Sequence, residues 1–256
     1  MKRLLLLSVI LLLFSCAGQE KSKDLAPQPQ EFAPQLIAHA GGVIDSCTYT
    51  NSREAMLHSL AKGYRFIEFD LLFTSDSVLV AAHSWEKFNS MTGFGHLGDS
   101  VPRYSDFVSR KICGRYTPLS ATEINSFFEQ HDSLYLVTDK ISDPDVLQEY
   151  FPALKDRMVV EAFSFQHYCR LKNRGYYRVL YSCMAHDLNA TLFSSSLSEI
   201  EWFALHTSAF DRLSFKLVKE FCDFDIALFT VDDIDSVPVE ERKAVKMLYT
   251  NFIEPR

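Results

Sequence analysis

The segment that decides the fold is residues 36–85, in which four short motifs follow one another. They read LIAHAGG at 36–42, YTNSREA at 49–55, FIEFDLLFTSD at 66–76 and VLVAAHSW at 78–85. His39 and His83 each end a short apolar run, and Glu68 and Asp70 lie between them at a period of two. On a strand, this period puts both carboxylates on one face. If the apolar runs are neighbouring parallel strands, histidines and carboxylates meet at one strand end, which is the layout of a metal-assisted acid/base site.

Apolar runs of similar length continue through the rest of the chain and alternate with amphipathic segments. Near-continuous apolar runs are typical of parallel strands that are covered on both faces. The expected strands are 35–38, 65–71, 78–82, 134–139, 158–162, 178–182, 226–231 and 246–250. A weaker ninth candidate, 202–206, competes for the same eight places. Repeated β–α units of this number predict an α/β protein with a single-domain (β/α)8 TIM barrel, and a doubly wound open sheet is the alternative.

Helix signals fall between the expected strands. Asn51 and Ser120 are each followed three residues later by a glutamate, which is the pattern of a capping box at a helix N-terminus. We therefore interpret Asn51 as a helix cap in preference to a substrate contact. Residues 86–118 show no clear periodicity. A segment of this length indicates a functional cover or insertion and not a simple connection.

Ionisable residues gather where the expected strands end. In a barrel of this class the active site forms at the C-terminal ends of the strands. Glu68, Asp70 and Asp139 are the expected metal ligands, because carboxylates suit a hard divalent cation such as Mg²⁺ or Ca²⁺. His39 and His83 are the expected general acid and base, since histidine titrates near working pH. Which of the two is the acid and which the base stays open.

Three further side chains are candidates for substrate binding. Lys140 could add a positive charge, although its position next to Asp139 puts it on the opposite strand face. Glu161 lies within an expected strand and either points into the barrel mouth or forms a salt bridge inside the barrel. Trp85 could line an apolar substrate cleft, or it could belong to an aromatic cluster that packs the long segment after it.

The motifs resemble those of the glycerophosphodiester phosphodiesterase family, whose pattern is H-R-G, E-N-T, E-x-D, T-x-D-G and H-D. The corresponding segments here are His39-Ala40-Gly41, Thr50-Asn51-Ser52, Glu68-Phe69-Asp70, Thr74-Ser75-Asp76-Ser77 and His83-Ser84. Weaker similarity continues at 136–140, 229–232 and 249–251. The resemblance therefore covers most of the mature domain, with high specificity only in its first third.

The resemblance implies a barrel phosphodiesterase that uses one divalent cation. Its metal ligands match Glu68, Asp70 and Asp139, and its acid and base match His39 and His83. In that family an adjacent hydroxyl of the substrate can attack phosphorus to give a cyclic phosphate, which water then opens. The expected substrate is a glycerophosphodiester or a related phospholipid- or glycan-derived diester.

Several positions depart from the family pattern. Ala40 replaces an arginine that would contact phosphate, Thr50 replaces a glutamate and Ser84 replaces an aspartate. Thr138 stands where a glutamate is expected two residues before the lysine, so Asp139 matches only if the register slips by one. The departures indicate a divergent branch that accepts a different diester or has lost its catalysis.

Two rival functions remain open. One is a catalytically silent barrel that binds an envelope ligand, which the loss of the arginine at Ala40 motivates. Retention of His39 and His83 argues against it, because a binder has no chemical need for two proton carriers. The other rival is a lyase that stops at the cyclic phosphate, as in sphingomyelinase-D-like relatives.

The N-terminal residues indicate export and lipid anchoring. Residues 1–15 have a positive start and then the apolar run LLLLSVILLLF, which is typical of a signal peptide. The end of this run, Leu13-Phe14-Ser15-Cys16, resembles a bacterial lipobox, although Phe14 is bulkier than usual. We expect acylation of Cys16, a flexible tether over 16–34 and the barrel domain over 35–256, at the cell envelope and facing the periplasm or outer membrane. An ordinary secretory signal is the alternative.

Charge and cysteine usage exclude other classes of site. A net charge of −7 and a pI near 5.6 argue against a nucleic-acid-binding surface. No cysteine pair has the CxxC spacing of a zinc site. The five cysteines outside the lipobox could form at most two disulfides; they are Cys47, Cys113, Cys169, Cys183 and Cys222.

Overall fold

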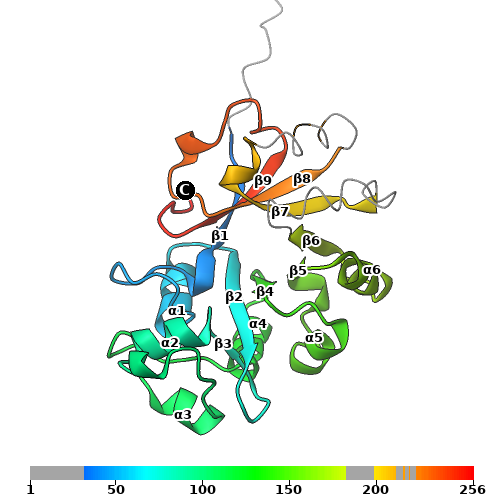
Figure 1. Cartoon of the computed structure of the whole chain (residues 1–256). Helices are drawn as coiled ribbons and strands as arrows, with labels where there is room; N and C mark the ends of the chain where they lie inside the picture. The colour runs from blue at the N-terminus through cyan, green and yellow to red at the C-terminus, as the bar shows by residue number, and fades with distance from the viewer. Residues whose placement is uncertain (1–31, 183–198, 212–215, 217–218, 220–222) are drawn as a thin grey trace, which may run out of the picture. The chain divides into compact units, whose positions relative to one another are not determined.

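Parallel strands close into a barrel in the computed structural model (Figure 1). Among the residues that the structure describes, eight strands form it: β1 (Gln35–Ala38), β2 (Phe66–Phe73), β4 (Tyr135–Asp139), β5 (Met158–Ala162), β6 (Arg178–Ser182), β7 (Trp202–His206), β8 (Asp225–Phe229) and β9 (Val245–Thr250). Each strand pairs in parallel with the next, and β1 closes the ring by pairing with both β9 and β2. The predicted (β/α)8 barrel is confirmed.

The structure describes residues 32–182, 199–211, 216, 219 and 223–256. Residues 32–256 form one compact unit. The expected signal peptide, the lipidated Cys16 and nearly all of the expected tether lie outside the described residues, as do Cys183 and Cys222. Cys47, Cys113 and Cys169 are free thiols. No helix in the described ranges is both long enough and apolar enough to cross a bilayer.

One expected barrel strand lies outside the barrel. Residues 79–81 form β3 (Leu79–Ala81), which pairs antiparallel with the end of β2. The prediction of 78–82 as a barrel strand is therefore wrong, and the weaker candidate, β7, takes the eighth place. The reason is the length of the connection. Only five residues separate β2 from β3, whereas a parallel neighbour needs a crossover of about a dozen or more.

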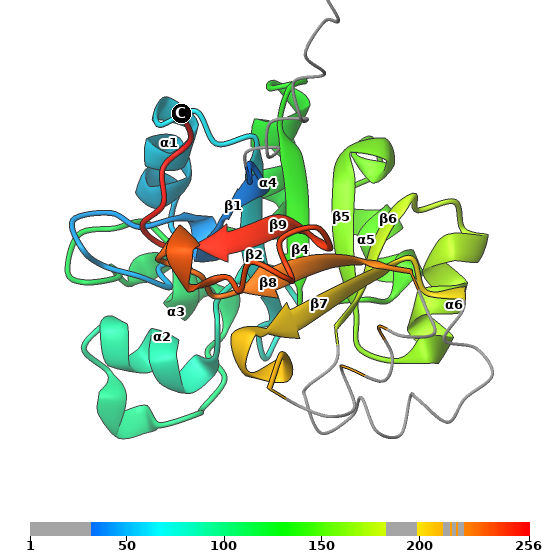
Figure 2. The same cartoon turned by 90° about the horizontal axis from the view of Figure 1, so that it is seen from above.

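Helices follow several of the strands on the outside of the barrel (Figure 2). They are α1 (Arg53–Ala61), α2 (Trp85–Met91), α3 (Tyr104–Ser109), α4 (Ala121–Glu129), α5 (Pro144–Tyr150) and α6 (Phe165–Asn173). Short 3-10 helices add η1 (His39–Gly41), η2 (Gly95–Leu97), η3 (Lys155–Arg157), η5 (Thr207–Ala209) and η6 (Ile234–Ser236). The long 86–118 segment thus contains most of α2 together with η2 and α3. The connection from β8 to β9 contains η6 and no α-helix.

One of the two predicted helix caps is confirmed. Ser120 and Glu123 form a reciprocal capping box at the start of α4. The prediction of Asn51 as a cap is wrong, because the hydroxyl of Ser52 accepts the N–H of Ala55 and caps α1. The cap lies one residue further along the chain, which leaves Asn51 for the site described below.

Successive side chains of β2 point to opposite faces of the barrel wall. Ile67 and Phe69 belong to the large core between the strands and the helices. Phe66 belongs to the smaller core inside the barrel. Because side chains alternate along a strand, Glu68 and Asp70 share the inner face with Phe66, near the C-terminal end of β2. This is the end at which the site is built.

Candidate active site

The HAGG motif forms a tight turn directly after β1. Ala40 adopts a left-handed conformation, with φ of 52°, and its N–H donates to Glu68 Oε2 at 2.6 Å. Gly42 has φ of 96°, and a Cβ there would lie 1.9 Å from the hydroxyl oxygen of Ser59. That hydroxyl donates to the carbonyl of Gly41 at 2.9 Å. Only glycine fits this close approach, so the motif presents a backbone amide to the first carboxylate.

Three carboxylates converge at the end of β2 and β4. Glu68 and Asp70 are 1% exposed, and Asp139 pairs in register with Asp70 across the two strands. One oxygen from each of the three lies within 4.8 Å of the others. The three predicted metal ligands are thus brought together. The threonine at 138, where the family pattern has glutamate, lies on the opposite strand face from Asp139, as the alternation requires.

Asn51 holds the central carboxylate of this group. Its side-chain amide donates to Asp70 Oδ2 at 2.9 Å, and its side-chain carbonyl accepts the N–H of Asp70 at 3.1 Å. Asn51 is fully buried. Asn51 matches the asparagine of the family's E-N-T motif. This match indicates a role in the site, whereas the capping-box pattern points to the wrong role.

Lys140 contacts the same group, contrary to the expectation from strand alternation. It has φ of 70°, so the chain leaves the strand geometry at this residue. The ammonium lies 3.2 Å from Asp70 Oδ1 and 3.2 Å from Asp139 Oδ2. A left-handed residue after a strand end redirects its side chain. The alternation of side chains along a strand does not predict this change of direction.

The pKa values of the three carboxyls diverge. Burial raises the pKa of Glu68 well above its usual range, and the charges of Asp70 and Asp139 add to the effect. Burial, together with the charge of Asp70, also raises the pKa of Asp139 to about 6. Burial would raise the pKa of Asp70 too, but Lys140, His83 and the Asn51 amide together lower it. Asp70 is therefore the carboxyl held as an anion.

The acidic cluster of Glu68, Asp70 and Asp139 fits a divalent cation. Glu68 Oε1 is buried and has no hydrogen-bond partner among the described residues, which is costly unless a ligand satisfies it. When all three carboxyls are ionised, they and the ammonium of Lys140 leave two negative charges. An oxygen-rich site with this residual charge suits Mg²⁺ or Ca²⁺.

The two histidines meet around a tyrosine that the sequence analysis did not select. The ring of Tyr49 lies 4.7 Å from that of His39 and 4.8 Å from that of His83, edge-on in both cases. Burial lowers the pKa of both histidines, and the charge of Asp70 partly opposes this in each. The neutral imidazoles are thus favoured near neutral pH.

His83 reaches the site by a different route from the one expected. It follows β3, which runs back along β2, and is not the end of a parallel strand. The N–H of Ala82 donates to the carbonyl of Asp70 at 2.9 Å, so the returning chain places His83 next to the acidic cluster. The histidines and carboxylates lie together as predicted, but an antiparallel hairpin, and not a parallel strand, brings His83 to them.

The remaining substrate-binding candidates have structural contacts. Glu161 is buried in β5, and the hydroxyl of Tyr249 donates to its Oε1 at 2.5 Å. Within the described residues it forms no salt bridge, and burial raises its pKa to about 8. Trp85 is the first residue of α2 and packs edge-on against Phe88 and Phe107, with ring centroids 6.2 and 6.3 Å away. This is the aromatic cluster that was the alternative to a cleft.

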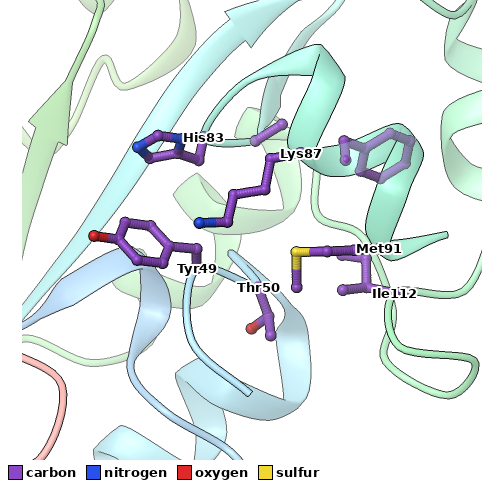
Figure 3. A pocket seen from close by; sticks show the side chains of 8 residues that line it. Tyr49, Thr50, His83, Lys87, Met91 and Ile112 are labelled. Atoms are coloured by element: carbon purple, nitrogen blue, oxygen red, sulfur yellow. The ribbon is translucent and has the colours of Figure 1, made fainter. Parts of the chain in front are cut away.

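A small pocket opens beside His83 (Figure 3). Its lining residues are Tyr49, Thr50, Ala82, His83, Lys87, Phe88, Met91 and Ile112. The Lys87 ammonium lies over the Tyr49 ring, 3.6 Å from its centroid. The sequence analysis selected neither Tyr49 nor Lys87. Lys87 lies in the segment without clear periodicity, and only the fold brings the two side chains together.

Comparison with solved structures shows the same fold over most of the chain. A protein of Agrobacterium tumefaciens str. C58, assigned to the glycerophosphoryl diester phosphodiesterases, is 14% identical, with 86% of this chain and 94% of that chain covered and a TM-score of 0.64. A glycerophosphodiester phosphodiesterase of Parabacteroides distasonis is 15% identical, with 85% and 92% covered and a TM-score of 0.61. An Oleispira antarctica phosphodiesterase, solved with the product sn-glycerol-3-phosphate, is 15% identical, with 86% and 94% covered and a TM-score of 0.58.

Sequence comparison identifies the family. No curated protein sequence matches the chain significantly. The sequence model of the glycerophosphoryl diester phosphodiesterase family matches residues 42–173. This span is more than half of the chain and includes Glu68, Asp70, His83 and Asp139; His39 lies just before it. The chain therefore belongs to the glycerophosphoryl diester phosphodiesterase family and is a phosphoric diester hydrolase.

Proposed function

We propose that the protein hydrolyses a glycerophosphodiester, or a related phospholipid- or glycan-derived diester, with one divalent cation and two catalytic histidines. One observation carries the proposal. Asp70 belongs to the acidic cluster and also lies within electrostatic reach of both His39 and His83. A phosphoryl group at this point would meet a cation on one side and two imidazoles on the other.

The residues of the chain have separate roles in this reaction. Glu68, Asp70 and Asp139 would hold Mg²⁺ or Ca²⁺, which supplies positive charge against the charge that develops on the phosphoryl oxygens. Asn51 and Lys140 hold the carboxylates in place. One histidine takes the proton of the attacking hydroxyl as its oxygen bonds to phosphorus. The other, in its protonated imidazolium form, gives a proton to the alcohol oxygen as its bond to phosphorus breaks. Water then opens the cyclic phosphate, and the histidine pair takes the proton of the water and returns one to the ring oxygen that leaves phosphorus.

His39→Ala and His83→Ala test the proposal against His96→Ala, a control at an exposed histidine of η2. Loss of an acid or base lowers turnover of a glycerophosphodiester by about 10²- to 10⁴-fold. His96→Ala should keep wild-type turnover. The measurement is alcohol release with Mg²⁺ and then with Ca²⁺, with a circular dichroism spectrum of each variant. Activity that survives both histidine variants contradicts the proposal.

The product separates hydrolysis from the lyase alternative. Phosphorus NMR of the finished reaction should show a phosphomonoester. A cyclic phosphate that persists assigns the protein to the lyases. A wild-type protein that binds diesters but turns none over with either cation is a binder, the second alternative.

We propose further that the protein is lipid-anchored at the bacterial cell envelope through Cys16. The apolar run followed by Leu13-Phe14-Ser15-Cys16 supports this. Mass spectrometry of the mature N-terminus should find acylated Cys16, and Cys16→Ser should release the protein from the membrane fraction. A mature chain that begins elsewhere without lipid contradicts the anchor and leaves the enzymatic proposal intact.

A further inference from the structure

The ammonium of Lys87 has an unusual position beside the histidines. Lys87 is the third residue of α2. Its backbone N–H donates at 3.2 Å to the hydroxyl of Ser84, the N-cap residue that directly follows His83. The short helix therefore holds Lys87 at a fixed place relative to His83. Figure 3 shows its half-buried side chain running toward Tyr49, with the His83 imidazole on the same side.

The two lysines of this site differ in their partners. Lys140 is neutralised by Asp70 and Asp139. Lys87 forms no ion pair with any described residue, and its ammonium rests on the face of the Tyr49 ring instead. A cation–π contact is weaker than a charge-assisted hydrogen bond to an anion. The Lys87 ammonium is thus available to form an ion pair with an anionic ligand.

The Tyr49 ring occupies the space that such a ligand would need. It contacts both imidazoles, at 4.7 and 4.8 Å between centroids, as well as the Lys87 ammonium. A group that exchanges protons with both histidines must come close to both of them. It would then lie where the ring now lies, next to the ammonium.

We propose that Lys87 binds a non-bridging oxygen of the substrate's phosphodiester group, and that Tyr49 is a cover that the anion displaces. Entry of the anion exchanges the ring–ammonium contact for a charge-assisted hydrogen bond. This supplies a cation on the histidine side of the site, where Ala40 offers none. The inference rests on the proposed function for the identity of the anion.

Binding of sn-glycerol 3-phosphate, measured by calorimetry in the presence of Mg²⁺, tests Lys87 without reference to turnover. Lys87→Ala should weaken binding by about 10- to 100-fold, the effect of one charge-assisted hydrogen bond. Lys87→Arg keeps the charge and should bind within a few fold of wild type. The control is Lys172→Ala, which removes a lysine of α6 whose only described partner is Glu201 on the surface. It should bind like wild type.

Steady-state kinetics with a glycerophosphodiester give the second readout. Lys87→Ala should raise KM by a similar factor while kcat falls much less, because the lysine binds the anion and moves no proton. A fall in kcat alone, with KM unchanged, overturns the assignment of Lys87 as a binding residue.

Tyr49→Ala tests the cover. If the ring must leave before the anion binds, its removal should leave binding of glycerol 3-phosphate as tight as in wild type or tighter. Weakening comparable to that of Lys87→Ala overturns the cover, because the ring would then be part of the binding surface. Circular dichroism and the unfolding midpoint of each variant show whether it is folded.

These outcomes separate the inference from the proposed function. A wild-type protein that turns over diesters while Lys87→Ala binds and reacts normally overturns the inference alone. A wild-type protein that lacks turnover but binds glycerol 3-phosphate in a Lys87-dependent way overturns the proposed function and supports the inference. Absence of both binding and turnover overturns both.

Discussion

Left-handed backbone conformations at Ala40 and Lys140 direct two donors into the site. Ala40 turns its N–H toward Glu68, and Lys140 turns its ammonium toward Asp70 and Asp139. A left-handed conformation costs a residue with a Cβ about 1–2 kcal/mol. Each strained residue gives a donor to a buried carboxylate, which needs one. The strain is therefore offset at the acidic cluster itself.

Glu161 carries a pH prediction at this scale. Burial raises its pKa from 4.5 to about 8, so the folded protein holds the proton more tightly than the unfolded chain. The stabilisation is complete below pH 4.5 and is lost as the pH rises through about 8. Glu161→Gln is neutral throughout and can still accept the Tyr249 hydroxyl. Its free energy of unfolding should fall less between about pH 5 and pH 9 than that of wild type, with about 1.4 kcal/mol for each pKa unit removed.

Urea unfolding at several pH values, with a chelator present, measures this difference. The chelator keeps metal binding at the neighbouring carboxylates from masking the effect. Parallel stability curves for wild type and Glu161→Gln would show that Glu161 is ionised in the folded protein, contrary to the prediction.

At the scale of elements, the β2–β3 hairpin decides how the second histidine reaches the site. β2 continues past its in-register partners in β4, and β3 returns along this extension. The turn between them is held by Thr74, whose hydroxyl accepts the N–H of Val78 at 3.0 Å. A short hairpin thus replaces a full β–α unit and leaves His83 directly before Ser84, the N-cap residue of α2.

The capping box of α4 gives a prediction about one element. Ser120 caps the first turn, and the Glu123 side chain accepts the N–H of Ser120 in return. Ser120→Ala should lower the free energy of unfolding by about 0.5–2 kcal/mol, because it leaves an N–H of the first turn without its acceptor. Ser126→Ala, at an exposed position later in the same helix, should change it by less than about 0.5 kcal/mol. Urea midpoints compare the two, and equal effects would refute the role of the cap.

At the scale of the whole molecule, the barrel stabilises and positions an acidic cluster that the isolated strands could not tolerate. Glu68 and Asp70 are buried on the inner face of β2, and Asp139 reaches them from β4. Three neighbouring carboxylates repel one another, and burial strengthens the repulsion. The closed sheet keeps them together, so a bound cation should stabilise the folded protein.

Metal binding should therefore raise the free energy of unfolding of the whole barrel, which can be measured. Mg²⁺ or Ca²⁺ at 100 times its dissociation constant should raise the free energy of unfolding by about 2.7 kcal/mol. Binding should strengthen as the pH rises through about 6, the pKa of Asp139, because protons must leave first. Glu68→Gln should lose most of the effect, and Glu129→Gln, at an exposed residue of α4, should retain it. Thermal unfolding with and without chelator tests this, and an effect of the cation that persists in Glu68→Gln would contradict the assignment.

The sequence by itself determined the barrel class, most strand positions and the five residues that form the acidic cluster and the histidine pair. The strands and the acidic pair depend on local periodicity, because the alternation in β2 already puts Glu68 and Asp70 on one face, whereas His39 and His83 are indicated by the family motifs. Only the tertiary structure decided that β3 leaves the barrel, that Asn51 binds Asp70 and that Tyr49 and Lys87 join the histidines. These contacts depend on connection length and left-handed residues, which bring distant segments together and leave no periodic trace along the chain.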